Sequence, residues 1–180
     1  MIPSADACFE LMDKYGMLDH IKDHSIMVEK VASLIARSLV EAGENLSLHK
    51  VTAGALLHDI AKTLCLGTGQ DHAAKGEEIC LQNRLDEIAD IVGQHVHLRD
   101  YRRSTPIVEK EIVYYADKRV NDDQVVSLEE RLNYLLAHYG RNQKDLHRLI
   151  RENFELCKTL EKKLFAKLEF TPEALPDMIE

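Results

Sequence analysis

Features that mark several protein classes are scarce in this sequence. Its four cysteines include no CxxC pair, which favours reduced thiols over a disulfide framework or a zinc knuckle. There is no run of five or more basic residues, and the formal net charge of −8 argues against a nucleic-acid duplex as a partner. No apolar run approaches the ~20 residues that span a bilayer, and the acidic start MIPSADACFE does not resemble a secretory signal. We therefore expect a cytoplasmic protein that does not bind a membrane.

Common nucleotide-binding and hydrolase motifs are also missing. The sequence contains no P-loop glycine-lysine motif, no GxGxxG, no HExxH and no GxSxG. In an acidic protein without these motifs, binding of an anionic substrate requires a local concentration of positive charge.

The spacing of apolar residues predicts an all-α protein. The 180 residues, of which 45% are hydrophobic, suffice for one domain with a substantial core. Between four prolines and eight glycines, apolar residues recur at three- and four-residue spacing, without a strand pattern. We expect a single-domain helical bundle over residues 1–180. The expected helices run from Ser4 to Gly16, Asp23 to Gly43, Ser47 through Lys62, Asp71 to Arg84, 85–96, 107–120, Ser127 to Gly140 and Gln143 to Leu168, with a short one after Thr171.

The stretch LLHDIAK, residues 56–62, places an imidazole and a carboxylate in an apolar helix. The preceding residues are nearly all small or aliphatic, a composition typical of a helix buried on most sides. A buried carboxylate costs several kcal/mol unless a partner compensates it. One His-Asp pair can arise by chance, but a metal ion is the partner that satisfies both groups together. His58 and Asp59 are therefore candidate ligands, provided that the chain supplies others.

Other polar residues interrupt apolar helix faces in the same way. They are His24, His72, His95 and Asp117, with His97 close to His95. Taken singly, each fits a hydrogen-bonded core or surface residue. A helical bundle with inward-facing histidines and carboxylates is, however, a known way to hold a pair of metal ions. The set as a whole favours a metal site.

In order and type, these residues resemble the HD superfamily of metal-dependent phosphohydrolases. The matching motifs are His-Ser at 24–25, HDIAK at 58–62 and YYADKRV at 114–120, within residues of about 20–135. More narrowly, the chain is similar to the binuclear-metal branch and its bacterial dinucleoside-polyphosphate hydrolases, which carry a Lys at the same spacing after HD and a similar Tyr-Ala-Asp. It departs from them after Asp117 and in a shorter interval from HD to the next histidine, which leaves the substrate open.

The resemblance implies a ligand role for each of these positions. It implies that His24, His58, Asp59 and Asp117 hold one metal ion and that His72 and His95 hold a second, with Asp59 bridging the two. Imidazole and carboxylate ligands without thiolate suit Fe, Mn, Co, Ni or Zn, and we favour Fe or Mn. Two such ions share and activate a water, which attacks phosphorus in line. The expected activity is hydrolysis of a nucleotide or another small phosphoester.

Two neighbouring histidines compete for one of these positions. On a continuous helix His95 and His97 lie about 200° apart, so one of them faces the site. The buried stripe that includes Ile91 and Val92 continues to His95 and not to His97, which favours His95. If the helix frays into a turn before its end, His97 can swing inward, so both remain candidates.

Lys62 is the basic residue nearest to the HD pair in sequence. It follows Asp59 by three residues, on the same face of the expected helix. We expect Asp59 and Lys62 to take part in catalysis, Lys62 by binding a phosphoryl oxygen or by supporting the leaving group. The alternative is an exposed lysine near a helix end.

A second group of basic residues lies in the loop after His95. Arg99, Arg102 and Arg103 form the densest basic cluster of the sequence. We expect this cluster to bind the phosphate of a small phosphorylated substrate. The alternative is a solvated loop with an ion pair to Asp100.

Two other functions fit the same residues. A di-iron oxygenase would use the same ligands to activate dioxygen, and a regulatory module would bind a nucleotide without turning it over. Metal content and turnover of a panel of nucleotides separate these alternatives from a phosphohydrolase.

The C-terminal residues 141–180 are expected to form a helical extension. Its apolar positions, which include Leu146, Leu149 and Phe154, recur at helical spacing. The stripe fits packing against the core or against a partner chain, which leaves a homodimer open.

Overall fold

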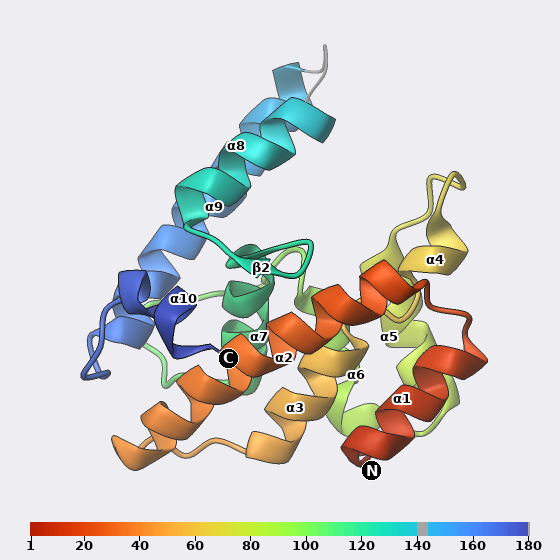
Figure 1. Cartoon of the computed structure of the whole chain (residues 1–180), viewed down its shortest axis with the longest axis horizontal. Helices are drawn as coiled ribbons and strands as arrows, with labels where there is room; N and C mark the ends of the chain where they lie inside the picture. Colours follow the sequence, from red (N-terminus) through yellow and green to blue (C-terminus); the bar gives the residue numbers. More distant parts are fainter. Residues whose placement is uncertain (140–143, 180) are drawn as a thin grey trace.

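The computed structural model describes residues 1–139 and 144–179, and these form an all-α protein, as the apolar periodicity predicts. The helices are α1 (Ala5–Lys14), α2 (Asp19–Glu41), α3 (Leu48–Leu57), α4 (Lys62–Cys65), α5 (His72–Gln82), α6 (Asp86–Gln94), α7 (Glu109–Lys118), α8 (Leu128–Tyr139), α9 (Lys144–Phe165), a 3-10 turn (Pro172–Ala174) and α10 (Leu175–Met178) (Figure 1). None of the helices in the described ranges has the length and apolar character that a bilayer crossing requires.

Side-chain caps begin four of the helices where the sequence predicts them. The hydroxyl oxygens of Ser4 and Ser47 accept backbone N–H groups of the first turns of α1 and α3, at 3.3 and 3.4 Å. The Asp71 carboxylate accepts an N–H of α5 at 2.9 Å. At the start of α8, Ser127 and Glu130 form the expected reciprocal capping box. The expected boundaries at Gly140 and Gln143 lie outside the described residues.

Helix α2 begins one turn earlier than expected, at Asp19 instead of Asp23. The residue before it, Leu18, has extended backbone, and its N–H donates to the Thr63 hydroxyl at 3.2 Å. The extra turn buries Ile21, which is 4% exposed, against the core. Burial of an apolar side chain therefore extends the helix beyond the residue with the better capping side chain.

A two-stranded hairpin, which the apolar pattern does not predict, follows α7. Strand β1 (Val120–Asn121) pairs antiparallel with β2 (Gln124–Val125), and Asp122 in the turn has a φ of 53°. Two residues per strand are too few to show an alternating pattern in sequence. The turn nevertheless positions the Asp122 carbonyl against α2.

Helix α2 forms the spine of the core. It lies across the middle of the molecule, and α3 and α7 pack on it (Figure 1). Its inward face carries Val28, Val31, Ile35 and Leu39, which are fully buried at helical spacing. These contacts fix the relative positions of the helices that carry the candidate ligands.

Two glycines allow close packing around α6. A Cβ on Gly54 of α3 would lie 2.6 Å from the Ile91 side chain, and one on Gly76 of α5 would lie 2.8 Å from that of Val92. Such distances are shorter than van der Waals contact, so α3 and α5 can approach α6 this closely only without a side chain. The close approach brings the C-terminal ends of α3 and α6 together.

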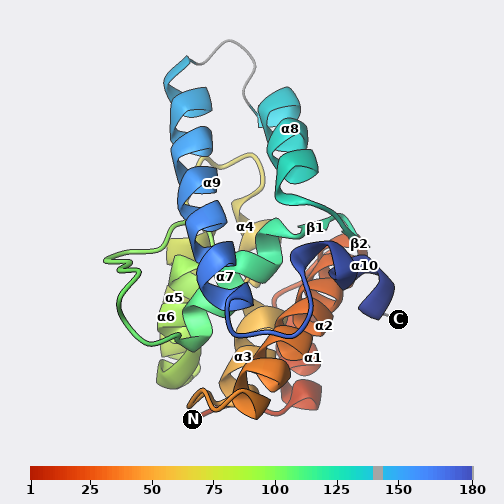
Figure 2. The same cartoon turned by 90° about the vertical axis from the view of Figure 1, so that its left-hand side faces the viewer.

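Helices α8 and α9 form a hairpin that rises from the body of the protein (Figures 1 and 2). The second half of α9 packs against α7, where Cys157, Leu160 and Leu164 are fully buried. The same contact contains an ion pair, because Lys163 Nζ lies 2.8 Å from a Glu111 oxygen. Both side chains are less than a tenth exposed, so the pair joins α9 to α7 in the interior.

We expect Lys163→Met to lower the free energy of unfolding by about 3–5 kcal/mol, because it leaves the Glu111 carboxylate buried without a partner. The matched control is Lys162→Met, at an exposed neighbouring position of α9, and should change stability by less than about 0.5 kcal/mol. Urea unfolding followed by circular dichroism measures both. Equal stability of the two variants would contradict the structural role of this ion pair.

Candidate metal centre

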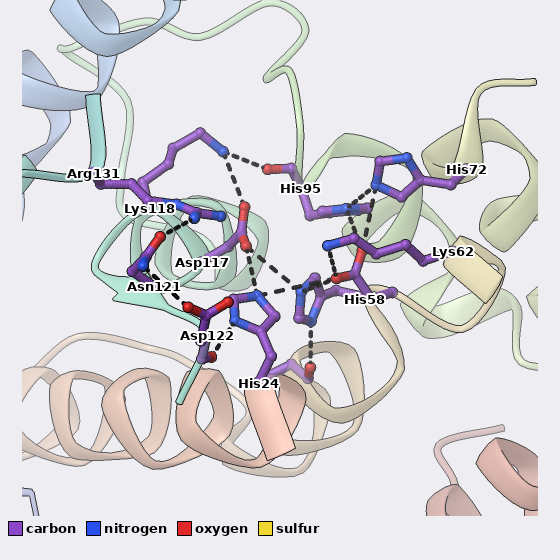
Figure 3. A network of polar contacts seen from close by, with 12 residues as sticks. His24, His58, Lys62, His72, His95, Asp117, Lys118, Asn121, Asp122 and Arg131 are labelled. Carbon is purple, nitrogen blue, oxygen red and sulfur yellow. Dashed lines mark hydrogen bonds and ion pairs between the residues drawn. The ribbon is translucent and has the colours of Figure 1, made fainter. Parts of the chain in front are cut away.

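Six residues from distant parts of the chain contact one another, and Figure 3 shows five of them with labels around Asp59. They are His24 of α2, His58 and Asp59 after α3, His72 at the start of α5, His95 directly after α6 and Asp117 near the end of α7. Four of them, including both HD residues, are at most 5% exposed. The structure therefore brings the whole set of predicted ligands together, with His72 and Asp117 partly exposed.

The HD pair lies in a turn instead of in the expected continuous helix. Helix α3 ends at Leu57, and the His58 ring folds back so that its Nδ1 lies 2.7 Å from the Ala55 carbonyl oxygen. The backbone N–H of Lys62 donates to the Asp59 carbonyl and closes the turn at 2.9 Å. Because the helix stops here, both side chains of the pair point into the same space.

One group of candidate ligands surrounds the Oδ2 atom of Asp59. The Nε2 atoms of His58 and His24 lie 3.4 and 4.0 Å from this oxygen. Asp117 closes the group, because its Oδ1 lies 3.1 Å from His24 Nε2 and 3.6 Å from His58 Nε2. Two imidazoles and two carboxylates thus face a common centre.

A second group surrounds the other oxygen of the same carboxylate. Asp59 Oδ1 lies 3.3 Å from His72 Nε2 and 3.5 Å from His95 Nε2. The two imidazole nitrogens are 3.2 Å apart. His95 reaches this group and His97 does not, because α6 ends at Gln94 with His95 still in helical conformation. The two oxygens of Asp59 therefore face two separate pairs of histidines.

Backbone carbonyls set the tautomers of three histidines. The Nδ1 atoms of His24, His58 and His95 lie 2.8, 2.7 and 2.6 Å from carbonyl oxygens, which are acceptors. Each Nδ1 must therefore carry a proton and donate it. In a neutral ring the Nε2 lone pair is then free, and it points at the carboxylates.

The geometry of both groups fits a metal cation. Lone pairs on nitrogen and oxygen repel one another unless a positive charge lies between them, and His58 Nε2 is buried without a hydrogen-bond partner. Two ligand atoms that are each about 2.1 Å from an ion, at tetrahedral or octahedral angles, lie roughly 3.0–3.4 Å apart. The distances of 3.1–3.5 Å between nearest donors of each group are close to this range.

The pKa values of the buried groups also indicate that the site attracts positive charge. Burial opposes protonation of His58, but the carboxylates of Asp59 and Asp117 raise its pKa to about 10. Burial also opposes ionisation of Asp59, yet His58 and Lys62 hold the pKa of this carboxyl well below its usual value. Burial lowers the pKa of His95, which keeps that ring neutral. The site thus retains its carboxylates in charged form and attracts a cation.

Lys62 contacts the candidate metal centre directly. Its Nζ lies 2.7 Å from Asp59 Oδ2. Burial opposes the charge of this amine, but Asp59 raises its pKa, so Lys62 is positively charged. The side chain is about one third exposed and lines the cavity above the cluster, where a substrate can reach it.

The structure places the predicted arginine cluster elsewhere. Arg99 pairs with Asp90 and Glu77, at 3.4 and 3.6 Å, and not with Asp100. With Arg102 it lines a separate cavity of about 380 Å³. Arg103 is exposed and is absent from the described lining of the cavity above the ligands. The chain turns away after α6, where Asp100 has a φ of 56°, so proximity to His95 in sequence does not become proximity in space.

Two basic residues outside the predicted set, Lys118 and Arg131, line the cavity above the centre. Lys118 Nζ lies 3.4 Å from Asp117 Oδ2 and donates to the His95 carbonyl at 2.7 Å, which joins the two halves of the site (Figure 3). Arg131 of α8 donates to Asn121 at 2.7 Å, while its Nε is buried without a partner. Lys118 could be found from the sequence, because it directly follows Asp117 in an apolar helix. No sequence pattern singles out Arg131.

A cavity of about 490 Å³ opens above the centre. Its floor contains Asp59, His72, His95 and Asp117, and its cationic lining consists of Lys62, Lys118 and Arg131. Apolar residues of α8 and α9 form much of the rest. The arrangement provides a cation site at the base and three positive side chains for an anion beside it.

Comparison with known proteins identifies the family. The HD-domain family model matches residues 21–122, which is more than half of the chain and includes all six candidate ligands. The chain belongs to the HD-domain family. HD domains bind divalent metal ions and are largely metal-dependent hydrolases, in agreement with the cluster of histidines and aspartates.

Parts of several known proteins align with this chain. The tRNA (cytidine(56)-2'-O)-methyltransferase of Thermoplasma volcanium is 35% identical over 97 residues, which cover 53% of this chain and 27% of that protein. Its namesake from Picrophilus torridus is 31% identical over 147 residues, 73% of this chain and 40% of that protein. An uncharacterized protein of Methanocaldococcus jannaschii is 24% identical over 153 residues, 77% of this chain and 88% of its own length. The chain thus spans less than half of the two methyltransferases, and no solved structure matches it.

The two neighbouring histidines after α6 provide a test of the candidate centre. We expect His95→Ala to lower the number of metal ions bound per chain, because it removes a nitrogen 3.5 Å from Asp59. His97→Ala is the matched control and should leave the metal content unchanged. Inductively coupled plasma mass spectrometry of the purified variants measures both. Loss of metal from the His97 variant alone would show that the end of α6 differs from this structure.

Proposed function

We propose that this HD domain is a metal-dependent phosphohydrolase that acts on a nucleotide or another small phosphoester. The observation that carries the proposal is the geometry around Asp59, because its two carboxylate oxygens face different pairs of histidines. A carboxylate in this position suits a bridge between two ions, which is the arrangement of two-metal phosphohydrolases. We therefore propose two divalent ions per chain.

The ligand set and the charge balance support this proposal. The candidate donors are imidazole nitrogens and carboxylate oxygens, with no cysteine among them, a combination that suits Fe or Mn. Two divalent ions would bring four positive charges against the two negative charges of Asp59 and Asp117. The net positive charge would attract a phosphate into an otherwise acidic protein.

The side chains around the cavity suit the handling of a phosphoryl group. When bound, the ions would lower the pKa of a water to near neutrality and polarise the phosphoryl oxygens. Lys62 and Lys118 lie beside Asp59 and Asp117, so occupation of those carboxylates by ions would leave both amines available to a phosphate. Arg131 adds a guanidinium on the same side of the cavity. These three residues bind and orient the phosphoryl group and stabilise negative charge as it develops.

Other activities are less well supported by these residues. The methyltransferase name belongs to relatives of which this chain spans 27% and 40%, and an acidic chain with a cation site is poorly suited to an RNA backbone. A di-iron oxygenase would share the ligands, but three cationic side chains around them favour an anionic substrate over dioxygen. Metal analysis followed by a phosphate-release screen over nucleotides and simple phosphoesters distinguishes a hydrolase from an oxygenase or from a regulatory module that binds a nucleotide without turnover.

We expect Asp59→Asn to lower the metal content and abolish phosphate release, because an amide bridges two cations poorly and removes a negative charge from both groups. The helical circular dichroism should remain, since the replacement has the same shape. Asp90→Asn is the matched control, at an aspartate that is 55% exposed and lies outside the centre. Normal turnover by the Asp59 variant would contradict the proposal.

Lys62→Met tests the role of the cationic lining separately from metal binding. The variant should keep its metal content but lose about 10²–10³-fold in rate, as when one charged contact to a transition state is removed. Lys75→Met is the control, because Lys75 pairs with Glu78 on the surface of α5. Unchanged kinetics in the Lys62 variant would return this lysine to a purely structural role beside Asp59.

A further inference from the structure

The hairpin of α8 and α9 builds one wall of the cavity above the metal centre. This hairpin follows the residues that match the HD-domain family, which end at 122. The apolar lining consists mainly of Leu135 of α8, Leu146, Leu149, Ile150 and Phe154 of α9, and Leu66 after α4. Figure 1 shows the hairpin on one side of the upper part of the molecule and α4 with its following loop on the other.

Two of these apolar side chains are exposed to water. Leu149 is 49% exposed and Leu66 is 58% exposed. A single exposed leucine needs no explanation, but these two line the same cavity, and its floor carries the charged cluster. The cavity therefore combines a cationic base with an apolar wall.

The wall offers few free hydrogen-bonding groups. Asn153 is already engaged, because its amide donates to the Val96 carbonyl at 3.0 Å and its oxygen accepts the Tyr114 hydroxyl at 2.7 Å. The carboxylates among the described lining residues are Asp59 and Asp117, and both lie in the cluster at the floor. The polar lining residues Gln70 and His97 lie outside the hairpin. A sugar placed against the leucines of the hairpin would lose hydrogen bonds to water without replacement there, whereas an apolar group would lose none.

We propose that the α8–α9 hairpin binds the leaving group of the substrate, and that this group is apolar. The substrate class is then a phosphomonoester of an alkyl or aryl alcohol, in preference to a sugar phosphate. This inference rests on the proposed phosphohydrolase function, because the phosphate must lie at the metal centre for the alcohol to reach the wall.

The position of Arg131 links the two parts of the cavity. It lies in the first turn of α8, so the element that supplies Leu135 also supplies a cation to the cavity that contains Asp117. A phosphate at this cation and an apolar group at the wall can belong to one molecule. The volume of about 490 Å³ lies within the range of ~300–1,000 Å³ that is usual for pockets that bind small organic ligands.

A series of alkylphosphonates tests this inference without turnover, because their carbon–phosphorus bond is not a phosphoester. Methyl-, butyl- and hexylphosphonate are titrated into manganese-loaded protein by isothermal titration calorimetry. We expect the affinity to rise by about threefold to fourfold for each methylene that the wall buries. In steady-state assays, hexyl phosphate should likewise have a higher kcat/KM than ribose 5-phosphate.

Matched leucine variants assign the effect to the wall. Leu149→Ser should reduce the dependence on chain length and leave the affinity for methylphosphonate unchanged. Leu81→Ser is the control, since Leu81 is 50% exposed on α5 and is absent from the described lining of the cavity. It should behave as the unaltered protein does.

The possible outcomes separate this inference from the function on which it rests. Equal affinity for the three phosphonates would overturn the apolar leaving group and leave the phosphohydrolase proposal intact. Failure of metal-loaded protein to bind any phosphonate would overturn both. A dimer in sedimentation velocity that Leu149→Ser dissociates, together with no dependence on chain length, would show that a second copy covers the wall and would also overturn the inference.

Discussion

The buried carboxylate of Asp59 is the constraint on which the rest of the site depends. It is 1% exposed, it remains ionised, and imidazole nitrogens face both of its oxygens. An isolated charge in such a place would cost far more than a small domain can offset. Two sources of positive charge lower this cost. One is the Lys62 amine, and the other is a metal ion, for which the surrounding histidines are suitably arranged. A positive charge next to Asp59 therefore serves both the stability of the fold and the proposed chemistry.

The fold meets this demand mainly at the ends of helices. His58 and His95 both follow the last turn of a helix and donate to the carbonyl three residues earlier, so each ring is held by its own backbone. Gly54 lets α3 approach α6 closely enough for these two rings to meet. Ligand orientation thus comes from rigid elements, as a site with accurate geometry requires.

The sequence predicts what is local or periodic, and misses what depends on the path of the loops. The caps at Ser4 and Asp71 follow from neighbouring residues, and the structure contains both. Helical spacing likewise predicts that His95 faces the site, and its Nε2 lies 3.5 Å from Asp59. Arg131 lines the same cavity as Asp117 because a short hairpin returns the chain toward α2, and no local pattern encodes that return. The position of the arginines after α6 also depends on the path of a loop, since Arg99 and Arg102 line a separate cavity.

The contact between His24 and Asp117 joins residues that are 93 positions apart. His24 is also held by the carbonyl of Asp122, in the turn of the small hairpin. The first and last candidate ligands thus enclose most of the HD domain in one loop. An ion held by both would act as a reversible cross-link, and it would restrict the unfolded chain in the way that a long-range disulfide does. In a chain whose four cysteines are free, such an ion would add to the stability of the folded state without a covalent bond.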